Sequence, residues 1–272
     1  MSHYTVMVIT DDGDYETALE PFDESIEIEP YIDITREEII ANAREDYRDY
    51  QEGNYNNPEY FQEKWGDTDF NNDDAIIKRY MEFWGDECSF DEDGNELTTY
   101  NPKAKWDWYA LGGRWSGSLK LKAGSETIKD SEPPLFSFLE VEEGYTDHAQ
   151  VKDIDLSPNT DMIPFYERYW QINVEGSPMT KEEEESKQYD SWYNSKHYLE
   201  KYGDRDTYIK DQINLNTYAI LYHGEWIEPG KMGWFGCSSA NSSGYAEYRK
   251  KALEIMANLN PEDYISIVDC HI

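Results

Sequence analysis

The hydrophobic pattern places a β-strand close to each end of the chain. Residues 4–10 (YTVMVIT) are rich in β-branched side chains and stop at the turn sequence Asp11-Asp12-Gly13. Residues 264–271 (YISIVDCH) form a second run of the same kind. We expect these two strands to lie side by side in the centre of one sheet.

Between these strands, apolar residues recur at helical spacing in several polar segments. Thr35 and Glu38 form a capping box, and the helix behind it should end at Gly53. A second capping box, Thr180 and Glu183, opens a polar helix that should run to Gly203. Further helices are expected over residues 60–65, from a cap at Asn71 or Asn72 to Gly85, and from a cap at Ser242 or Ser243 to Met256.

Alternating or β-branched segments predict further strands over residues 118–122, 135–141, the second half of 165–174, and 217–222. A turn at residues 223–226 follows the last of these. Together the elements predict an α+β fold with a mostly antiparallel central sheet and helices packed on it. We expect residues 1–272 to form a single α+β domain. Residues 14–95 would be an acidic helical insertion, and residues 96–272 the sheet core with its helices.

Composition favours a folded protein with an acidic surface. Only 38% of the 272 residues are hydrophobic, but 23 Tyr, 9 Trp and 9 Phe supply large apolar surfaces for a core. The formal net charge is −34, and residues 1–100 contribute −23 of it. Such a field repels nucleic acid and anionic membranes and attracts basic partners. Direct nucleic-acid binding is therefore not expected. The acids either keep the protein soluble or mimic a phosphate backbone.

Cysteine usage and hydropathy favour a cytoplasmic protein. Cys88, Cys237 and Cys270 are far apart and form no CxxC pair, so neither a disulfide framework nor a structural zinc site is expected. The start of the chain lacks the basic region of a signal peptide. No apolar run approaches the roughly 18 residues of a membrane helix. We expect no membrane association, metal or cofactor, whereas a homo-oligomer is compatible with the sequence.

One stretch, residues 101–122 (NPKAKWDWYALGGRWSGSLKLK), reverses the charge of the chain. It is net +4 and holds three of the nine tryptophans. The cations are suited to phosphate and the tryptophans to stacking on a base. The glycine pair allows positive φ and two adjacent N–H groups that can receive an anion. The ligand-binding candidates in this stretch are Lys103, Lys105, Trp106, Trp108, Tyr109, Gly112, Gly113, Arg114 and Trp115.

A purely structural interpretation of this stretch is equally simple. Residues 106–109 would be a strand with its tryptophans in the core, and the glycine pair would be only a turn. Arg114 would then pair with one of the many acids. No Walker or GxGxxG pattern is present, so no familiar nucleotide motif decides between the two interpretations.

Two further segments carry candidate residues. Residues 232–236 (MGWFG) predict a tight turn that lays Met232, Trp234 and Phe235 over a neighbouring site, or an ordinary hairpin. In the last strand, Asp269 and His271 share one face, whereas Cys270 points away. An Asp–His pair can polarise a water or bind a metal, or the histidine can simply close the edge of the sheet. His3 would join this pair if the first strand lies beside the last.

The segments KWDWYALGGRW, GKMGWFG and VDCHI, in this order, resemble an uncharacterised family of small proteins encoded in phage and bacterial genomes. The resemblance covers the first strand, residues 100–122 and the last 60 residues. It implies an accessory gene, of the kind that counters host defence in phages. Such proteins act as DNA mimics, as direct inhibitors, or as traps for nucleotide signals.

The residues and the resemblance together favour a non-enzymatic protein that sequesters a small anionic, nucleotide-like ligand. One alternative is an acidic DNA mimic or direct inhibitor that binds a basic host protein. Another is a hydrolase of a nucleotide signal that uses Asp107, Asp269 and His271.

Overall fold

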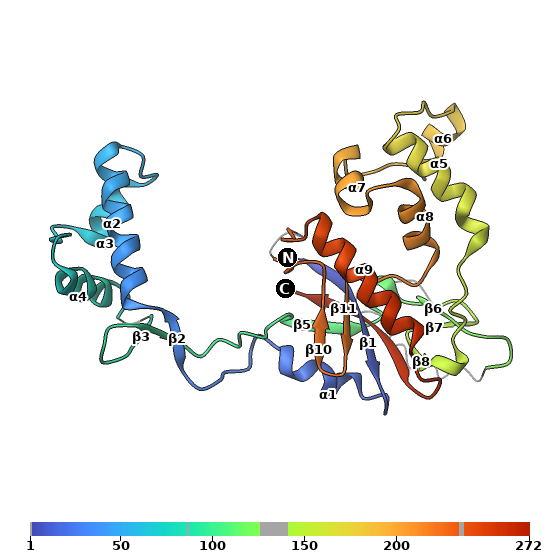
Figure 1. The fold of residues 1–272 in the computed structure, drawn as a ribbon, viewed down its shortest axis with the longest axis horizontal. Coiled ribbons are helices and arrows are strands. Elements are labelled where there is room, and N and C mark those ends of the chain that lie inside the picture. Colours follow the sequence, from blue (N-terminus) through green and yellow to red (C-terminus); the bar gives the residue numbers. More distant parts are fainter. Residues whose placement is uncertain (1, 86, 126–140, 234–236) are drawn as a thin grey trace. The chain divides into compact units, whose positions relative to one another are not determined.

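The computed structural model describes residues 2–85, 87–125, 141–233 and 237–272, in two compact units (Figure 1). The first, which we call the sheet unit, comprises Met1–Glu24 and Lys103–Ile272, and the second, the acidic unit, comprises Ser25–Pro102. These boundaries differ from the expected insertion of residues 14–95. Helix α1 (Tyr15–Leu19) belongs to the sheet unit, because its Leu19 packs in that unit's core.

The central sheet of the sheet unit has the strand order β10-β9-β1-β11-β5, and β8 also pairs with β11. Its strands are β1 (His3–Thr10), β5 (Trp108–Leu111), β8 (His148–Gln150), β9 (Ala219–Tyr222), β10 (Glu225–Ile227) and β11 (Tyr264–His271). Only β1 and β9 run parallel, and the other pairs of this sheet are antiparallel. The expected α+β class with a mostly antiparallel sheet is confirmed.

The two strands at the ends of the chain lie side by side at the centre of this sheet, as expected. They pair over their full length, from His3 opposite His271 to Thr10 opposite Tyr264. Ser2 and Ile272 extend the ladder with two reciprocal backbone hydrogen bonds of 3.1 Å. The labels N and C accordingly stand close together at one end of the sheet (Figure 1).

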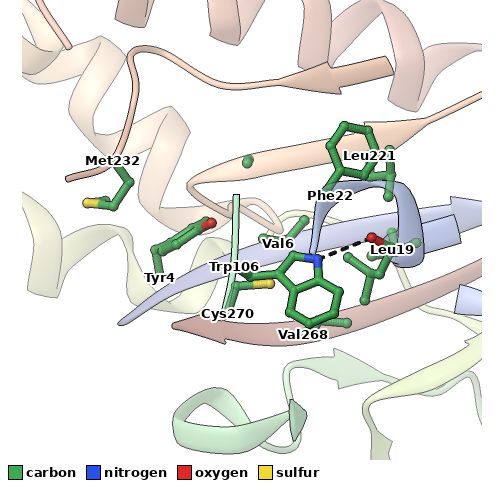
Figure 2. Close-up of a cluster of buried hydrophobic side chains, with 11 residues drawn as sticks. Tyr4, Val6, Leu19, Phe22, Trp106, Leu221, Met232, Val268 and Cys270 are labelled. Atoms are coloured by element: carbon green, nitrogen blue, oxygen red, sulfur yellow. Dashed lines mark hydrogen bonds between the residues drawn. The ribbon is translucent and has the colours of Figure 1, made fainter. Parts of the chain in front are cut away.

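Alternation along the strands gives the sheet two buried faces. Tyr4, Val6 and Val8 point to one face and pack with α1 and with Trp106, around the cluster drawn in Figure 2. Met7 and Ile9 point to the other face, which helix α9 (Ser242–Ala257) covers. The short strands β6 (Leu119–Lys120) and β7 (Tyr145–Thr146) pair with each other, and Leu119 packs in the same cluster as Met7.

Two sequence expectations in the sheet unit are wrong. Residues 165–174 were expected to end in a strand, but they lie in α5 (Ile163–Asn173) and its last turn, because Tyr166, Tyr169 and Trp170 recur at helical spacing against α8. The single helix expected from Thr180 to Gly203 is two helices, separated after Lys187 takes a left-handed φ of 55°. The remaining helices are α6 (Lys181–Ser186), α7 (Ser195–Tyr202) and α8 (Arg205–Ile213). The strand expected over residues 135–141 falls outside the described residues, apart from Val141.

The acidic unit has its own small core. Its helices α2 (Arg36–Glu52), α3 (Pro58–Trp65) and α4 (Asp73–Trp84) pack around Ile39, Phe61 and Trp65. A sheet of order β2-β4-β3 completes it, formed by β2 (Tyr31–Ile34), β3 (Ser89–Phe90) and β4 (Glu96–Thr98). The Thr35–Glu38 capping box and the left-handed Gly53 cap are confirmed. Within the residues described, none of the helices combines the length and apolar character needed to cross a membrane.

Candidate ligand-binding site

Two histidine–aspartate pairs lie together where β1, β11 and β5 meet the ends of the chain. His3 Nδ1 lies 2.8 Å from Asp269 Oδ1, and His271 Nδ1 lies 2.6 Å from Asp107 Oδ1. Because an ionised carboxylate only accepts, Nδ1 of each ring carries the proton and donates it. No described residue hydrogen-bonds to either Nε2. Each imidazole is thus oriented through one nitrogen and keeps the other for a further partner.

Backbone register explains why these residues meet. His3 and His271 are directly opposite in the β1–β11 pair, and His271 is directly opposite Trp108 in the β11–β5 pair. The two imidazole rings lie edge to face, with their centroids 4.9 Å apart. We call His3, Asp107, Trp108, Asp269 and His271 the His–Asp site.

Trp108 provides the aromatic surface of the site. Its indole stacks on His271, with ring centroids 5.1 Å apart and an angle of 18° between the planes. The residue remains 45% exposed, which is unusual for a tryptophan in a strand of a central sheet. An exposed ring stacked on an oriented imidazole can accept a planar ligand group.

The glycine pair brings the loop after β5 close to the protein's own carboxylates. Gly112 and Gly113 have φ values of 69° and 52°, and both residues are buried. A methyl group on Gly113 would overlap Asp269, and one on Gly112 would overlap Asp147. The positive φ values expected of the glycine pair are present, and they bring the backbone close to these two side chains. In particular, the N–H of Arg114 donates to Asp269 Oδ2 at 3.0 Å, so it is not free for a ligand.

Asp147 is a buried carboxylate beneath the same loop. Its Oδ1 accepts hydrogen bonds from the N–H groups of Gly117, at 2.6 Å, and Ser118, at 3.4 Å. Its Oδ2 is buried and has no hydrogen-bond partner among the described residues. Burial raises the pKa of this carboxyl above its ordinary value, although the two N–H groups act in the opposite direction. The Gly-Gly loop is thus held between two buried acids, Asp147 and Asp269.

Arg114 is the cation of residues 101–122 that is best placed for a ligand. Its main chain is fixed to Asp269 in the 3-10 turn Gly113–Trp115, while its side chain is exposed. The guanidinium forms no ion pair with the described residues, so its planar fork is available for an oxyanion. Lys103 is also exposed.

Other predicted residues of this stretch serve the structure of the sheet unit. Trp106 is buried in the core, where its indole N–H donates to the Leu19 carbonyl at 3.2 Å (Figure 2). Lys105 Nζ is 2.6 Å from Glu228 Oε1. Tyr109 packs edge-on against Trp106, and burial raises the pKa of its hydroxyl to about 12. Trp115 packs at the margin of the α9-covered cluster.

The MGWFG segment reaches the same end of the sheet. Met232 is buried beside Tyr4 in the core cluster (Figure 2). The Gly233 carbonyl accepts a hydrogen bond from the hydroxyl of Ser2, the residue before His3, at 2.7 Å. Trp234 and Phe235 lie outside the described residues. The three predicted segments thus meet at the end strands, but Met232 lies on the sheet face of Tyr4 and Cys270, opposite to that of Asp269 and His271, and not over the His–Asp site.

The last strand presents its residues as its alternation predicts. Asp269 and His271 face the site, whereas Cys270 is buried in the cluster of Figure 2. Burial raises the pKa of the Cys270 thiol, which disfavours a thiolate nucleophile. Among the described residues, no three His, Cys, Asp or Glu side chains are grouped so that they could hold a metal ion.

From the sequence, His3 was expected in the site only if the first strand lies beside the last, and Asp147 was not predicted as a site residue. The signal for His3 was its position one residue before the first apolar run, since pairing of the two end strands brings it opposite His271. Asp147 had no such signal, because it lies outside every segment that the sequence predicts to be a strand or a helix of the site.

Comparison of this chain with protein-family models, with curated proteins and with solved structures found no match.

Proposed function

We propose that the protein binds a small anionic, nucleotide-like ligand at the His–Asp site. The observation that carries the proposal is the exposed Trp108 ring, stacked on a histidine that Asp107 orients through Nδ1. The indole would stack on a base. The exposed Arg114 guanidinium would meet phosphate oxygens, and each Nε2, which carries the free lone pair, would accept a hydrogen bond from an N–H or O–H group of the ligand.

The acidic field of the chain opposes capture of an anion but does not forbid binding. Distant charges are screened over about 10 Å at 0.1 M salt, so cations in direct contact with the ligand dominate the bound state. The net charge of −34 would mainly slow the association. The resemblance to an accessory-gene family suggests that the ligand is a signal nucleotide and that its sequestration counters a host defence.

Titration of the full chain with cyclic nucleotides and ADP-ribose isomers tests this proposal by calorimetry. We expect saturable 1:1 binding of at least one compound. Trp108→Ala should weaken it by about tenfold, since base stacking on an aromatic side chain contributes about 1–3 kcal/mol. Arg114→Met should also weaken it. Trp192→Ala is the matched control, because Trp192 is 100% exposed and lies outside the site. Absence of binding across the panel would refute the proposal.

The same titration distinguishes binding from hydrolysis. His3 and His271, each oriented by an aspartate, are suited to act as base and acid on a phosphate ester. A cleaved product in the titrated sample, lost in His271→Asn, would favour the hydrolase alternative. An unchanged ligand favours sequestration.

One observation favours acidic mimicry as a second candidate function. The acidic unit is compact, and its 78 residues contain 22 Asp and Glu against six Lys and Arg, a net charge of −16. Five of the six cations already pair with carboxylates of that unit, which leaves an anionic surface. We propose that such a surface would occupy the DNA-binding face of a basic host protein.

Competition with a DNA duplex for a basic DNA-binding protein tests mimicry. The full chain should displace the duplex, and displacement should weaken steeply as salt rises. The triple variant Glu37→Gln, Glu59→Gln, Asp67→Asn should lose competition. These side chains are exposed in the acidic unit. The control triple Glu184→Gln, Glu185→Gln, Glu254→Gln changes the net charge equally in the sheet unit. Equal losses in both triples would contradict mimicry by the acidic unit.

A further inference from the structure

A polar cavity lies on the α9-covered side of the sheet unit, and none of its lining residues belongs to the His–Asp site. It has a volume of about 190 Å³ and is lined by residues of α7, α8 and α9 together with Thr5 of β1. Its charged lining residues are Lys201, Asp211 and Arg249, and Tyr245 and Tyr248 form part of its aromatic wall. A larger cavity of about 800 Å³ along α8 and α9 shares Asp211 and Arg249 with it.

The two cations of this cavity are not used in ion pairs. The Lys201 ammonium lies over the rings of Tyr202 and Tyr245, 5.1 and 5.5 Å from their centroids. Arg249 donates one hydrogen bond, from Nη1 to the Lys201 carbonyl oxygen at 2.8 Å. Among the described residues, no carboxylate lies within 4.0 Å of either charged group. Both residues are half-buried, and charged side chains withdrawn from water are ordinarily paired.

Asp211 compensates only one of the two charges. Its Oδ2 accepts a hydrogen bond from Asn216 Nδ2 at 2.7 Å, and it attracts Lys201 and Arg249 across the cavity without contact. The charged lining is thus net +1 in a chain of net −34. Burial lowers the pKa of Lys201, because the charged ammonium form is poorly solvated in the empty cavity. A bound anion would stabilise that charged form.

We propose that this cavity binds a small oxyanion, the carboxylate or phosphate group of a compact ligand, between Lys201 and Arg249. The guanidinium offers a planar fork of donors and the ammonium a mobile point charge, which together match an oxyanion. A volume of about 190 Å³ is below the roughly 300–1,000 Å³ of ordinary ligand pockets, so the anion carries few further atoms. This inference does not depend on the function of the His–Asp site.

Thermal unfolding of the full chain in phosphate, acetate or chloride at matched ionic strength tests the inference. Matched ionic strength is essential, because any salt stabilises so acidic a chain by screening. We expect phosphate or acetate to raise the melting temperature above that in chloride, with saturation. Lys201→Met, which keeps the apolar stem, should reduce the apparent affinity about tenfold or more. The control Lys196→Met removes an exposed cation of the same helix that pairs with Glu200, and should bind normally.

A second pair of variants separates binding from damage to the fold. Arg249→Met should weaken binding of the anion, as measured by calorimetric titration with inorganic phosphate. Asp211→Asn should strengthen binding of the anion, because the competing negative charge is removed. The amide oxygen of the new side chain can still accept the hydrogen bond from Asn216. A merely structural role would not produce these opposite directions. Identical melting temperatures in the three salts, wild-type affinity in Lys201→Met, or no gain in Asp211→Asn would overturn the inference.

Discussion

Replacement of Trp106 by alanine should destabilise the sheet unit by about 3–5 kcal/mol, the range typical of a large aromatic deletion in a core. The indole is buried among residues of β1, β11 and α1, and its N–H satisfies the Leu19 carbonyl (Figure 2). The variant loses this packing and leaves a buried carbonyl without its donor. Denaturant unfolding followed by circular dichroism measures the loss.

Trp108→Ala is the matched control for this prediction. The same residue type is deleted two positions away, but this indole is 45% exposed and its ring contacts are with two histidines. Its cost in unfolding free energy should be about 1 kcal/mol, whereas its effect on ligand binding should be large. Similar destabilisation by both substitutions would contradict the division of this stretch into a core tryptophan and a site tryptophan.

Gly113→Ala should cost about 3 kcal/mol or more and should also disturb the His–Asp site. A φ of 52° strains an alanine by about 1–2 kcal/mol, and the added methyl group overlaps the buried Asp269, where overpacking typically adds about 1–3 kcal/mol. Because Asp269 orients His3, its displacement should change the His3 imidazole resonances in NMR spectra. Unfolding free energy and these resonances are the two measurements.

Gly144→Ala separates backbone strain from overlap. Gly144 has a φ of 86°, and a methyl group there meets no atom within 4 Å. This variant should therefore show only the strain of about 1–2 kcal/mol, and the His3 resonances should be unchanged. If Gly113→Ala lowered the unfolding free energy no more than Gly144→Ala does, close packing against Asp269 would not explain why position 113 requires a glycine.

The sequence was sufficient for elements whose signals are local. The capping box at Thr35, the left-handed cap at Gly53 and the alternation of Asp269, Cys270 and His271 each depend on a few neighbouring residues, and each is confirmed. The adjacency of the end strands also followed, because two apolar strands need burial on both faces. The prediction that His3 joins the Asp269–His271 pair depended on that adjacency.

The wrong predictions concern segments whose secondary structure or exposure is determined by tertiary packing. Residues 165–174 contain aromatic side chains that suit either a strand or a helix, and the tyrosines of α7 and α8 select the helix. The position of Trp106 in the core and that of Trp108 at the surface depend on which face of the sheet α1 covers. Lys201 and Arg249 lie 48 residues apart, and nothing local indicates that they share a cavity.

The pairing of β1 with β11 also has a consequence for the order of folding. Its partners are separated by as many as 268 positions, from His3 to His271, so closing this pair costs loop entropy across nearly the whole chain. The internal contacts that define the acidic unit, in contrast, lie within Ser25–Pro102, and low sequence separation favours fast folding. During synthesis the acidic unit can therefore fold first, while β1 cannot pair with β11, and the His–Asp site cannot form, until β11 has been synthesised.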